Sequence, residues 1–444
     1  MSSRQLSAGP KDKRAVCVIG AGYAGLCAAR YLAPRFENLT VLERQSDVGG
    51  QWNYCGEVGK DQCGVERHGA IYQSLKTNFP RQIMDFPDFL NRDHPDHPSF
   101  VPHEDILLFL KRYTSHFELR QYIRFDSFVE SVSRRDDKWR VTWQDLKRRN
   151  GHVGHFDVVF ICIGHFAHAH WPSNLDFGKF EGKVAHSKDY RTPEEYRDKR
   201  VAVIGAGPSG VDIAIDVAST AKSVYLLYQP CRDLMGQEFP RNVTELKELP
   251  KKIETDGIVT DCDTKLVVDR IVLCTGYRFG FDELLPKGLV NVEDNRVTPL
   301  YKEICHVEYP DSLFFIGLQR QVPLGWLSSA QMKFALKKLL GDKTAIPTKE
   351  AMLRDEEKIF QQRRAIGMPV RKIHKLGHIN PADGKSAFRD YVVDLEASGG
   401  FERGALVPEI ILAILEDVVE KPVSKLRRLK YTVRSDKEFD VQSD

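Results

Sequence analysis

The string G-x-G-x-x-G occurs twice in this chain, each time between an apolar run and a helix-forming stretch. The first copy follows a predicted strand at residues 14–19 and enters a predicted helix at residues 26–32, with a second predicted strand at residues 39–43. In such a strand–turn–helix unit, the first glycine permits a tight turn, the second lets the backbone approach a pyrophosphate, and the third allows close packing of helix on strand. The first copy therefore predicts a dinucleotide site. Its glycines are Gly20, Gly22 and Gly25.

The residues that follow the first copy favour an unphosphorylated ribose. Glu43 ends the second predicted strand, where a carboxylate accepts hydrogen bonds from both ribose hydroxyls. The N-terminus of the intervening helix supplies free N–H groups and a partial positive charge to the phosphates. These features suit FAD. Further FAD contacts are predicted beside Glu43 and in the Gly-Gly turn downstream, at Arg44, Gly50, Gln51 and Trp52.

The second copy repeats the pattern in the middle of the chain. A predicted strand at residues 200–204 enters the glycine string, and a predicted helix at 211–219 and a strand at 223–228 follow. This last strand ends in Tyr228 and Gln229 rather than in an acid, and an acid would repel a 2′-phosphate. The pattern therefore admits NADPH, with Arg232 as the nearest cation for that phosphate. The glycines of this copy are Gly205, Gly207 and Gly210.

The order of the remaining strands predicts that one nucleotide-binding domain is inserted into the other. Apolar runs at residues 156–164 and 270–277 bracket the second glycine string, and a third run at 312–317 returns to the first domain. The fold class is α/β with two Rossmann-like domains. The predicted boundaries are a flexible N-terminus at 1–13, an FAD-binding domain at 14–171, an NADPH-binding domain at 172–280, and the second part of the FAD domain with a C-terminal helical region at 281–444.

Composition excludes several classes of protein. The chain has 444 residues, 42% hydrophobic and 29% charged, with a net charge of +3, which argues against disorder and against non-specific nucleic-acid binding. Nine cysteines without a C-x-x-C favour neither a disulfide framework nor a zinc ribbon. No metal site is expected, because the loop histidines His165, His168 and His170 have no carboxylate at ligand spacing. Without an apolar leader or spanning segment, the chain is expected to be cytoplasmic with no transmembrane anchor.

The segment between the two predicted domains carries the string F-x-G-x-x-x-H-x-x-x-Y. It resembles the fingerprint of the flavin-containing monooxygenases, which belong to the class B flavoprotein monooxygenases. Residues 72–87 resemble the active-site segment of that family, and residues 274–277 resemble its later strand end. The absence of an apolar C-terminal anchor makes the chain similar to the insect, fungal and bacterial members. The fingerprint residues are Phe180, Gly182, His186 and Tyr190.

The resemblance implies an NADPH- and O2-dependent monooxygenase that acts through a C4a-hydroperoxyflavin. Its substrate would be a small soft nucleophile, either an amine for N-oxygenation or a sulfide for S-oxygenation. Asn78 is the predicted catalytic residue, since an uncharged amide can hydrogen-bond the peroxide without protonating it. Thr77 and Gln331 are the further residues assigned to FAD, and Ser209 and Thr275 those assigned to NADPH. Many family members carry a Ser/Thr-Arg pair where this chain has Tyr228 and Gln229, which leaves the preference for NADPH over NADH open.

Four alternatives accompany this prediction. Baeyer–Villiger oxygenases carry a similar fingerprint, but usually with Trp in place of Tyr190. An NADPH oxidase producing mainly H2O2 would result from poor protection of the peroxide. A flavin disulfide reductase is rejected because Cys55 and Cys63 lie too far apart in sequence for a redox pair. A non-catalytic nucleotide sensor would require loss of flavin reduction. The identity of the amine or sulfide and the oligomeric state, including a homodimer, stay open.

Overall fold

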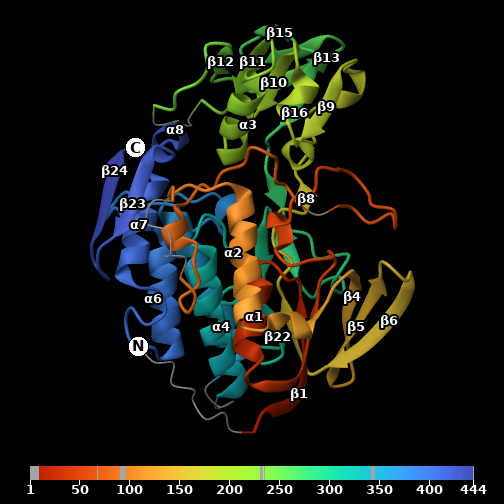
Figure 1. Ribbon diagram of the computed structural model, residues 1–444, viewed down its shortest axis with the longest axis vertical. Helices are drawn as coiled ribbons and strands as arrows, with labels where there is room; N and C mark the ends of the chain where they lie inside the picture. The colour runs from red at the N-terminus through yellow and green to blue at the C-terminus, as the bar shows by residue number, and fades with distance from the viewer. Residues whose placement is uncertain are drawn as a thin grey trace.

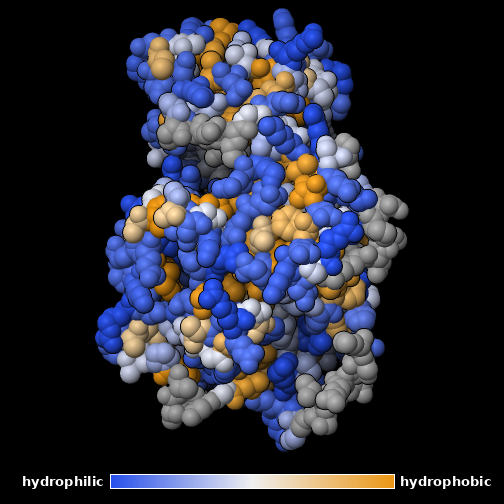
Figure 2. Space-filling model, turned by 90° about the vertical axis from the view of Figure 1, so that its left-hand side faces the viewer, coloured by the Kyte–Doolittle hydropathy of each residue, from blue (hydrophilic) through white to orange (hydrophobic). Residues whose placement is uncertain are grey.

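Two lobes, each built on a parallel β-sheet, make up the molecule (Figure 1). The computed structural model describes residues 10–67, 69–90, 97–230, 234, 236–341 and 346–443. In the space-filling view the smaller lobe lies above the larger one, and the outline narrows between them (Figure 2). Within the described ranges, no helix combines the length and the apolar character needed to cross a membrane.

The larger lobe contains a seven-stranded sheet of order β20-β21-β22-β7-β1-β2-β3. Strands β22, β7, β1, β2 and β3 are parallel, and β20 and β21 add an antiparallel edge. The strands are β1 (Asp12–Ile19), β2 (Phe36–Leu42), β3 (Ile123–Arg124), β7 (Val158–Ile161), β20 (Leu300–Tyr301), β21 (Cys305–His306) and β22 (Leu313–Phe315).

Successive side chains of β1 point to opposite faces of this sheet, and both faces are covered. Val16 and Val18 contact the helical side, whereas Cys17 and Ile19 contact the side covered by an antiparallel meander, and all four are buried. The meander consists of β4 (Ser127–Arg135), β5 (Lys138–Asp145) and β6 (Asn150–Phe156). The helices are α1 (Tyr23–Leu32), α2 (His103–His116), α4 (Leu324–Leu340), α5 (Lys349–Ala365), α6 (Ala387–Gly399), α7 (Glu409–Val419) and α8 (Val423–Leu426).

The smaller lobe contains a five-stranded parallel sheet of order β12-β11-β10-β16-β9. Helix α3 (Pro208–Ala218) covers one face, and a three-stranded antiparallel sheet covers the other. The main strands are β9 (Lys183–His186), β10 (Arg200–Ile204), β11 (Ser223–Leu227), β12 (Val243–Leu246) and β16 (Arg270–Leu273). The covering strands are β13 (Pro250–Glu254), β14 (Gly257–Thr260) and β15 (Lys265–Val267).

All strands of the smaller lobe lie between β7 and β22 in sequence, so this lobe is inserted into the larger one, as predicted. The chain passes from the larger lobe to the smaller one and later returns. The two connecting segments pair with each other, since β8 (His168–Ala169) is antiparallel to β17 (Tyr277–Arg278). The start of the larger lobe differs from the prediction, because β1 begins at Asp12, inside the segment predicted to be flexible. Residues 1–9 lie outside the described part of the chain.

Two predicted strands are too long, and both are cut where the backbone turns. The run predicted at 270–277 ends as β16 at Leu273, because Gly276 has a φ of +89° and redirects the chain into β17. The run at 156–164 is divided between the end of β6 and β7. The C-terminal region contains helices α5 to α8, and it also forms a hairpin of β23 (Leu429–Val433) and β24 (Phe439–Ser443). A further small hairpin consists of β18 (Asn291–Glu293) and β19 (Arg296–Thr298).

Candidate cofactor and active site

The first glycine turn lies at the carboxyl end of β1, the edge of a parallel sheet where nucleotides bind. A Cβ on Gly20, whose φ is +100°, would lie 2.6 Å from the carbonyl oxygen of Cys162. A Cβ on Gly25 would lie 1.8 Å from the carbonyl oxygen of Gly20. Helix α1 then begins at Tyr23, and it has no side-chain cap from Gly22 and no acid in its first turn. Its free N–H groups therefore fit a pyrophosphate.

Glu43 is buried directly beside this turn and accepts two backbone hydrogen bonds. Its Oε2 accepts from the N–H of Ala21 at 2.6 Å, and its Oε1 accepts from the N–H of Gln45 at 2.8 Å. Burial raises the pKa of Glu43, against the lowering effect of these two N–H groups. Each carboxylate oxygen keeps a second lone pair, so the residue is suited to the ribose hydroxyls of FAD.

The Gly-Gly turn closes against the first glycine turn. The N–H of Gly49 donates to the carbonyl oxygen of Ala21 at 3.0 Å, and the Gln45 side chain donates to the carbonyl oxygen of Gly50 at 2.8 Å. A Cβ on Gly50 would lie 3.0 Å from the Cα of Gly22. The two backbone turns therefore lie against each other. Trp52 is buried on Tyr23 of α1, Gln51 is half-buried, and Arg44 packs over the ring of Phe128.

The second glycine turn repeats this geometry in the smaller lobe. A Cβ on Gly205, whose φ is +104°, would lie 2.5 Å from the carbonyl oxygen of Cys274, and one on Gly210 would lie 1.7 Å from the carbonyl oxygen of Gly205. By contrast, a Cβ on Gly207 would have no atom within 4 Å. Helix α3 starts there without a side-chain cap or an acid in its first turn, so its N-terminus also fits a pyrophosphate.

The other residues assigned to NADPH differ in their burial and in their contacts. Ser209 is half-buried in the first turn of α3. The Thr275 hydroxyl donates to the carbonyl oxygen of His170, so it joins the two segments that connect the lobes. Tyr228 lines a hollow at the carboxyl ends of β11 and β12, together with Gln237, Glu245 and Lys247 among others. Arg232 lies outside the described residues.

Asn78 lies on a segment that contacts both lobes. At one end, the N–H of Gln73 donates to the carbonyl oxygen of Arg191 in the smaller lobe at 2.9 Å. At the other end, the Tyr23 hydroxyl of α1 donates to the carbonyl oxygen of Met84 at 3.1 Å. The Asn78 side chain between them is exposed, which leaves its amide free to face a ligand. Thr77 is buried, and its hydroxyl accepts from the N–H of Val101 at 3.2 Å.

Gln331 is fully buried in α4, and its amide is used within the protein. Its Oε1 accepts from the N–H of Gly317 at 2.9 Å, and its Nε2 donates to the side chains of Gln319 at 2.8 Å and Tyr391 at 2.9 Å. Gly317 follows β22, and a Cβ there would lie 3.1 Å from the Cβ of Ala24 in α1. Gln331 therefore fixes the loop that approaches the start of α1.

The fingerprint residues between the domains are structural elements of the smaller lobe. A Cβ on Gly182 would lie 2.5 Å from the Phe180 ring, which is buried in the core beside β13–β15. The Tyr190 hydroxyl donates to the Asp216 carboxylate of α3 at 2.5 Å, and its ring packs edge-on against Tyr72 at 5.5 Å between centroids. These contacts hold the sheet, α3 and the Asn78 segment together.

His186 ends β9 and is fully buried, and its Nδ1 accepts from the N–H of Lys188 at 3.0 Å. Burial lowers the pKa of His186 to about 4. An exposed histidine has a pKa of about 6.5, so the unfolded chain binds more protons than the folded protein between these values. Stability therefore falls as pH falls through that window.

We expect His186→Gln to remove about 2 kcal/mol from the difference in unfolding free energy between pH 7 and pH 5. Urea unfolding followed by circular dichroism at both pH values measures this difference. The exposed His168→Gln serves as the control. An unchanged difference in His186→Gln would show that this ring does not account for acid destabilisation.

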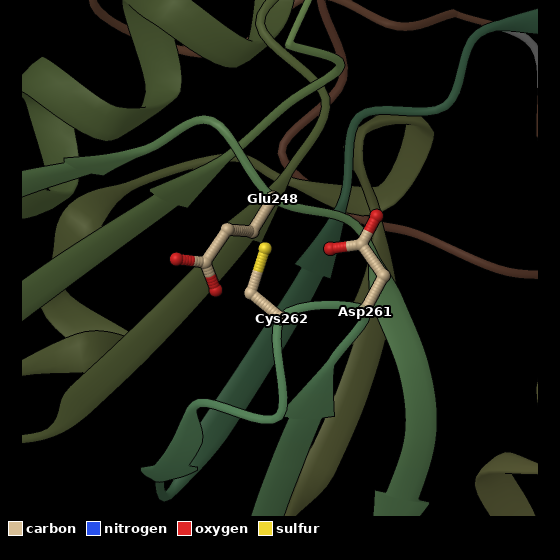
Figure 3. Close-up of side chains that lie close together, drawn as sticks. All are labelled: Glu248, Asp261 and Cys262. Carbon is tan, nitrogen blue, oxygen red and sulfur yellow. The ribbon is translucent and has the colours of Figure 1, made fainter.

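One group of three potential metal ligands comes together among the described residues: Glu248, Asp261 and Cys262, whose ligand atoms lie within 4.8 Å of one another (Figure 3). Both carboxylates already accept hydrogen bonds from residues at or next to the ends of strands β13 and β14. Glu248 accepts from the hydroxyl of Thr260 at 2.5 Å, and Asp261 accepts from the N–H of Leu249 at 3.0 Å. The group lies beside β14 and β15 on the far side of the sheet from α3. In the described part of the chain, His165, His168 and His170 form no such group.

Comparison with known proteins identifies the class. The family model described as flavin-binding monooxygenase-like matches residues 13–240. The chain is 32% identical to flavin-containing monooxygenase FMO GS-OX4 of Arabidopsis thaliana, covering 87% of this chain and 85% of that relative. Among solved structures, S-allyl-L-cysteine S-oxygenase from Allium sativum superposes with a TM-score of 0.82 at 31% identity, covering 94% of this chain and 95% of that one. Tmm from Pelagibacter sp. strain HTCC7211 superposes with a TM-score of 0.80 at 25% identity, covering 94% and 93%.

The fold and its two dinucleotide sites thus define a flavin-dependent oxidoreductase. More specifically, the chain belongs to the flavin-containing monooxygenase family. FAD and NADPH are the cofactors of this class, and both glycine turns have the open, uncapped geometry that such cofactors need.

Two residues that join the lobes were missed in the sequence: Asp212 of α3 and Arg427, which follows α8. Asp212 stands within the apolar run Val211–Ile213, and a charged residue in such a run is a recognisable sign of a buried polar contact. No local pattern marks Arg427, because its partner lies 215 residues away.

Proposed function

We propose that this protein is an NADPH- and O2-dependent monooxygenase whose preferred substrates are small sulfides, with amines as a second class. The balanced reaction is substrate, O2, NADPH and H+ giving oxygenated substrate, water and NADP+. The observation that carries the proposal is the position of Asn78, on a segment tied at one end to the NADPH lobe and at the other to α1 of the FAD lobe. The likeness to an S-oxygenase favours sulfides over amines.

The chain's own groups have separate tasks in this reaction. Bound FAD would supply the redox chemistry, by taking a hydride from NADPH and activating O2. The uncapped starts of α1 and α3 bind the two pyrophosphates, and Glu43 orients the FAD ribose. Asn78 presents an uncharged donor at the reacting oxygen, and it does not acidify the site. No side chain is required as a general base, which agrees with the neutral His186.

The preference for NADPH is part of the proposal. No acid ends β11, where Tyr228 donates to the Glu245 carboxylate at 2.9 Å and Lys247 lines the same hollow. Lys247 supplies positive charge for a 2′-phosphate there and offsets the negative charge of Glu245, which lines the same hollow. Arg232, which lies outside the described residues, stays the cation predicted from the sequence. The domain boundaries at 171 and 280 and a homodimer remain predictions from the sequence.

The test supplies purified protein with NADPH, ¹⁸O2 and either S-allyl-L-cysteine or a tertiary amine such as N,N-dimethylbenzylamine. We expect the sulfide to yield a sulfoxide carrying one ¹⁸O atom, in nearly equal amount to the NADPH consumed. H2O2 matching the NADPH consumed with both substrates would favour the oxidase. A parallel assay supplies cyclohexanone in place of the sulfide, and lactone formation there, without sulfoxide from the sulfide, would favour the Baeyer–Villiger alternative.

A further inference from the structure

The short helix α8 lies at the junction of the two lobes (Figure 1), and Arg427 directly follows it. Its guanidinium donates to both carboxylate oxygens of Asp212, at 2.8 Å to Oδ1 and 2.6 Å to Oδ2. The Asp212 side chain is only 5% exposed. A bidentate pair with a buried carboxylate is strong and fixes geometry as well as distance. The C-terminal segment is therefore fastened to α3, the helix that begins at the NADPH pyrophosphate site.

The same cluster reaches the segment that bears Asn78. The Nη2 of Arg427 donates to the carbonyl oxygen of Lys76 at 3.1 Å, two residues before Asn78. The Tyr72 hydroxyl donates to Oδ2 of Asp212 at 2.7 Å. One guanidinium thus joins α3 of the smaller lobe to the Asn78 segment of the larger lobe.

The segments on either side of Arg427 are anchored independently to the two lobes. Before it, the N–H of Ser424 donates to the side chain of Gln237 in the smaller lobe at 3.0 Å. After it, the N–H of Tyr431 donates to the hydroxyl of Ser99 in the larger lobe at 2.8 Å. The Gln82 side chain, close to Asn78 in sequence, donates to the carbonyl oxygen of Tyr431 at 2.6 Å. Arg427 is consequently held between two fixed points.

We propose that Arg427 is a positioning residue for the oxygenation reaction. Through Asp212 and the Lys76 carbonyl, it sets the distance between Asn78 and the NADP(H)-binding helix α3. The part of this inference that concerns oxygenation rests on the proposed function. Lysine can replace arginine here only in part, because a single ammonium lacks the planar fork that meets both Asp212 oxygens and the carbonyl together.

The physical consequence follows from the geometry. The start of α3 holds the pyrophosphate, so a shift of α3 moves the cofactor relative to Asn78. A misplacement of about 1 Å costs a reaction on the order of 100-fold. Loss of the Arg427 contacts to Asp212 and the Lys76 carbonyl should therefore lower product formation while NADPH consumption continues and FAD stays bound.

The experiment compares Arg427→Gln and Arg427→Lys with the matched control Arg428→Gln. The control substitution removes the same charge one residue away. Arg428 pairs on the surface with Glu238 at 3.4 Å, and the two side chains are 66% and 64% exposed. The first readout is hydrogen exchange of the amides of Gln73 and Thr77, which is independent of turnover. The second is the ratio of product to NADPH, with KM and kcat for NADPH measured separately.

In Arg427→Gln we expect both amides to exchange roughly tenfold faster and the product-to-NADPH ratio to fall roughly tenfold, with KM for NADPH changed much less. Arg427→Lys should show the same loss in part, and Arg428→Gln should match the wild type. Arg427→Gln leaves the buried charge of Asp212 without its cation, which destabilises the fold. The double variant Asp212→Asn/Arg427→Gln removes that charge as well, and its ratio of product to NADPH should still be low.

Two results would overturn the inference. If exchange is unchanged in Arg427→Gln, the guanidinium does not hold the Asn78 segment. If exchange rises but the ratio of product to NADPH stays at the wild-type value, Arg427 is structural and does not position Asn78. Should the wild type itself make only H2O2, the proposed function fails, whereas the exchange data still decide whether Arg427 joins the lobes.

Discussion

Gly25→Ala should yield a colourless protein, whereas Gly210→Ala should yield a yellow protein that NADPH reduces poorly. Each new Cβ would meet a backbone carbonyl oxygen, at 1.8 Å in the first turn and 1.7 Å in the second. The helix must move away from its strand, and overpacking of this kind costs about 1–3 kcal/mol or more. Since 1.4 kcal/mol is a factor of ten in affinity, each cofactor should bind about tenfold to 100-fold more weakly.

The two variants differ because each helix start serves one cofactor. Flavin absorbance of the purified protein measures bound FAD, and anaerobic reduction by NADPH measures the second site. Gly151→Ala is the control, because a Cβ on this β6 residue would have no atom within 4 Å. Loss of FAD in Gly210→Ala with normal FAD in Gly25→Ala would reverse the assignment of the two turns.

Asn78→Asp should abolish most oxygenation and leave flavin reduction largely intact. The substitution keeps the shape of the side chain but replaces an uncharged amide donor with a carboxylate that only accepts. Loss of one donor at a reacting oxygen typically lowers the rate by about 100- to 1,000-fold. We expect sulfoxide formation to fall by at least about 100-fold, with NADPH consumption continuing and H2O2 replacing the product.

The control for this variant is Asn291→Asp, an exposed amide on β18. It should retain the wild-type ratio of product to NADPH. Normal sulfoxide formation in Asn78→Asp would remove this residue from the active site and shift attention to other groups on the segment between the lobes.

Local sequence patterns predicted the two glycine turns because each glycine's requirement arises within a few residues. Gly20 and Gly205 have positive φ angles at the carboxyl ends of β1 and β10, where the strings placed the turns. The insertion of one domain into the other was also predictable, from the order of the apolar runs. The strand at 270–277 was predicted too long because apolar character continues through Cys274, although Gly276 turns the chain.

Contacts between distant segments were not predictable from one sequence. Gln331 was assigned to FAD, but the structure shows its amide holding Gly317, Gln319 and Tyr391. The pair of Arg427 and Asp212 depends on how the C-terminal segment crosses both lobes, and side-chain periodicity carries no information on that path. The Arg427–Asp212 pair joins the C-terminal segment to α3 of the smaller lobe.

The most direct test of the central claim is a two-step mixing experiment on the yellow protein. NADPH is added without oxygen until the flavin absorbance is bleached, and oxygen is then admitted while the spectrum is recorded. We expect a lag before the oxidised-flavin band returns, and we expect an added sulfide to shorten this lag as sulfoxide forms. Immediate return of that band with H2O2 equal to the NADPH used, whether or not sulfide is present, would contradict the central claim.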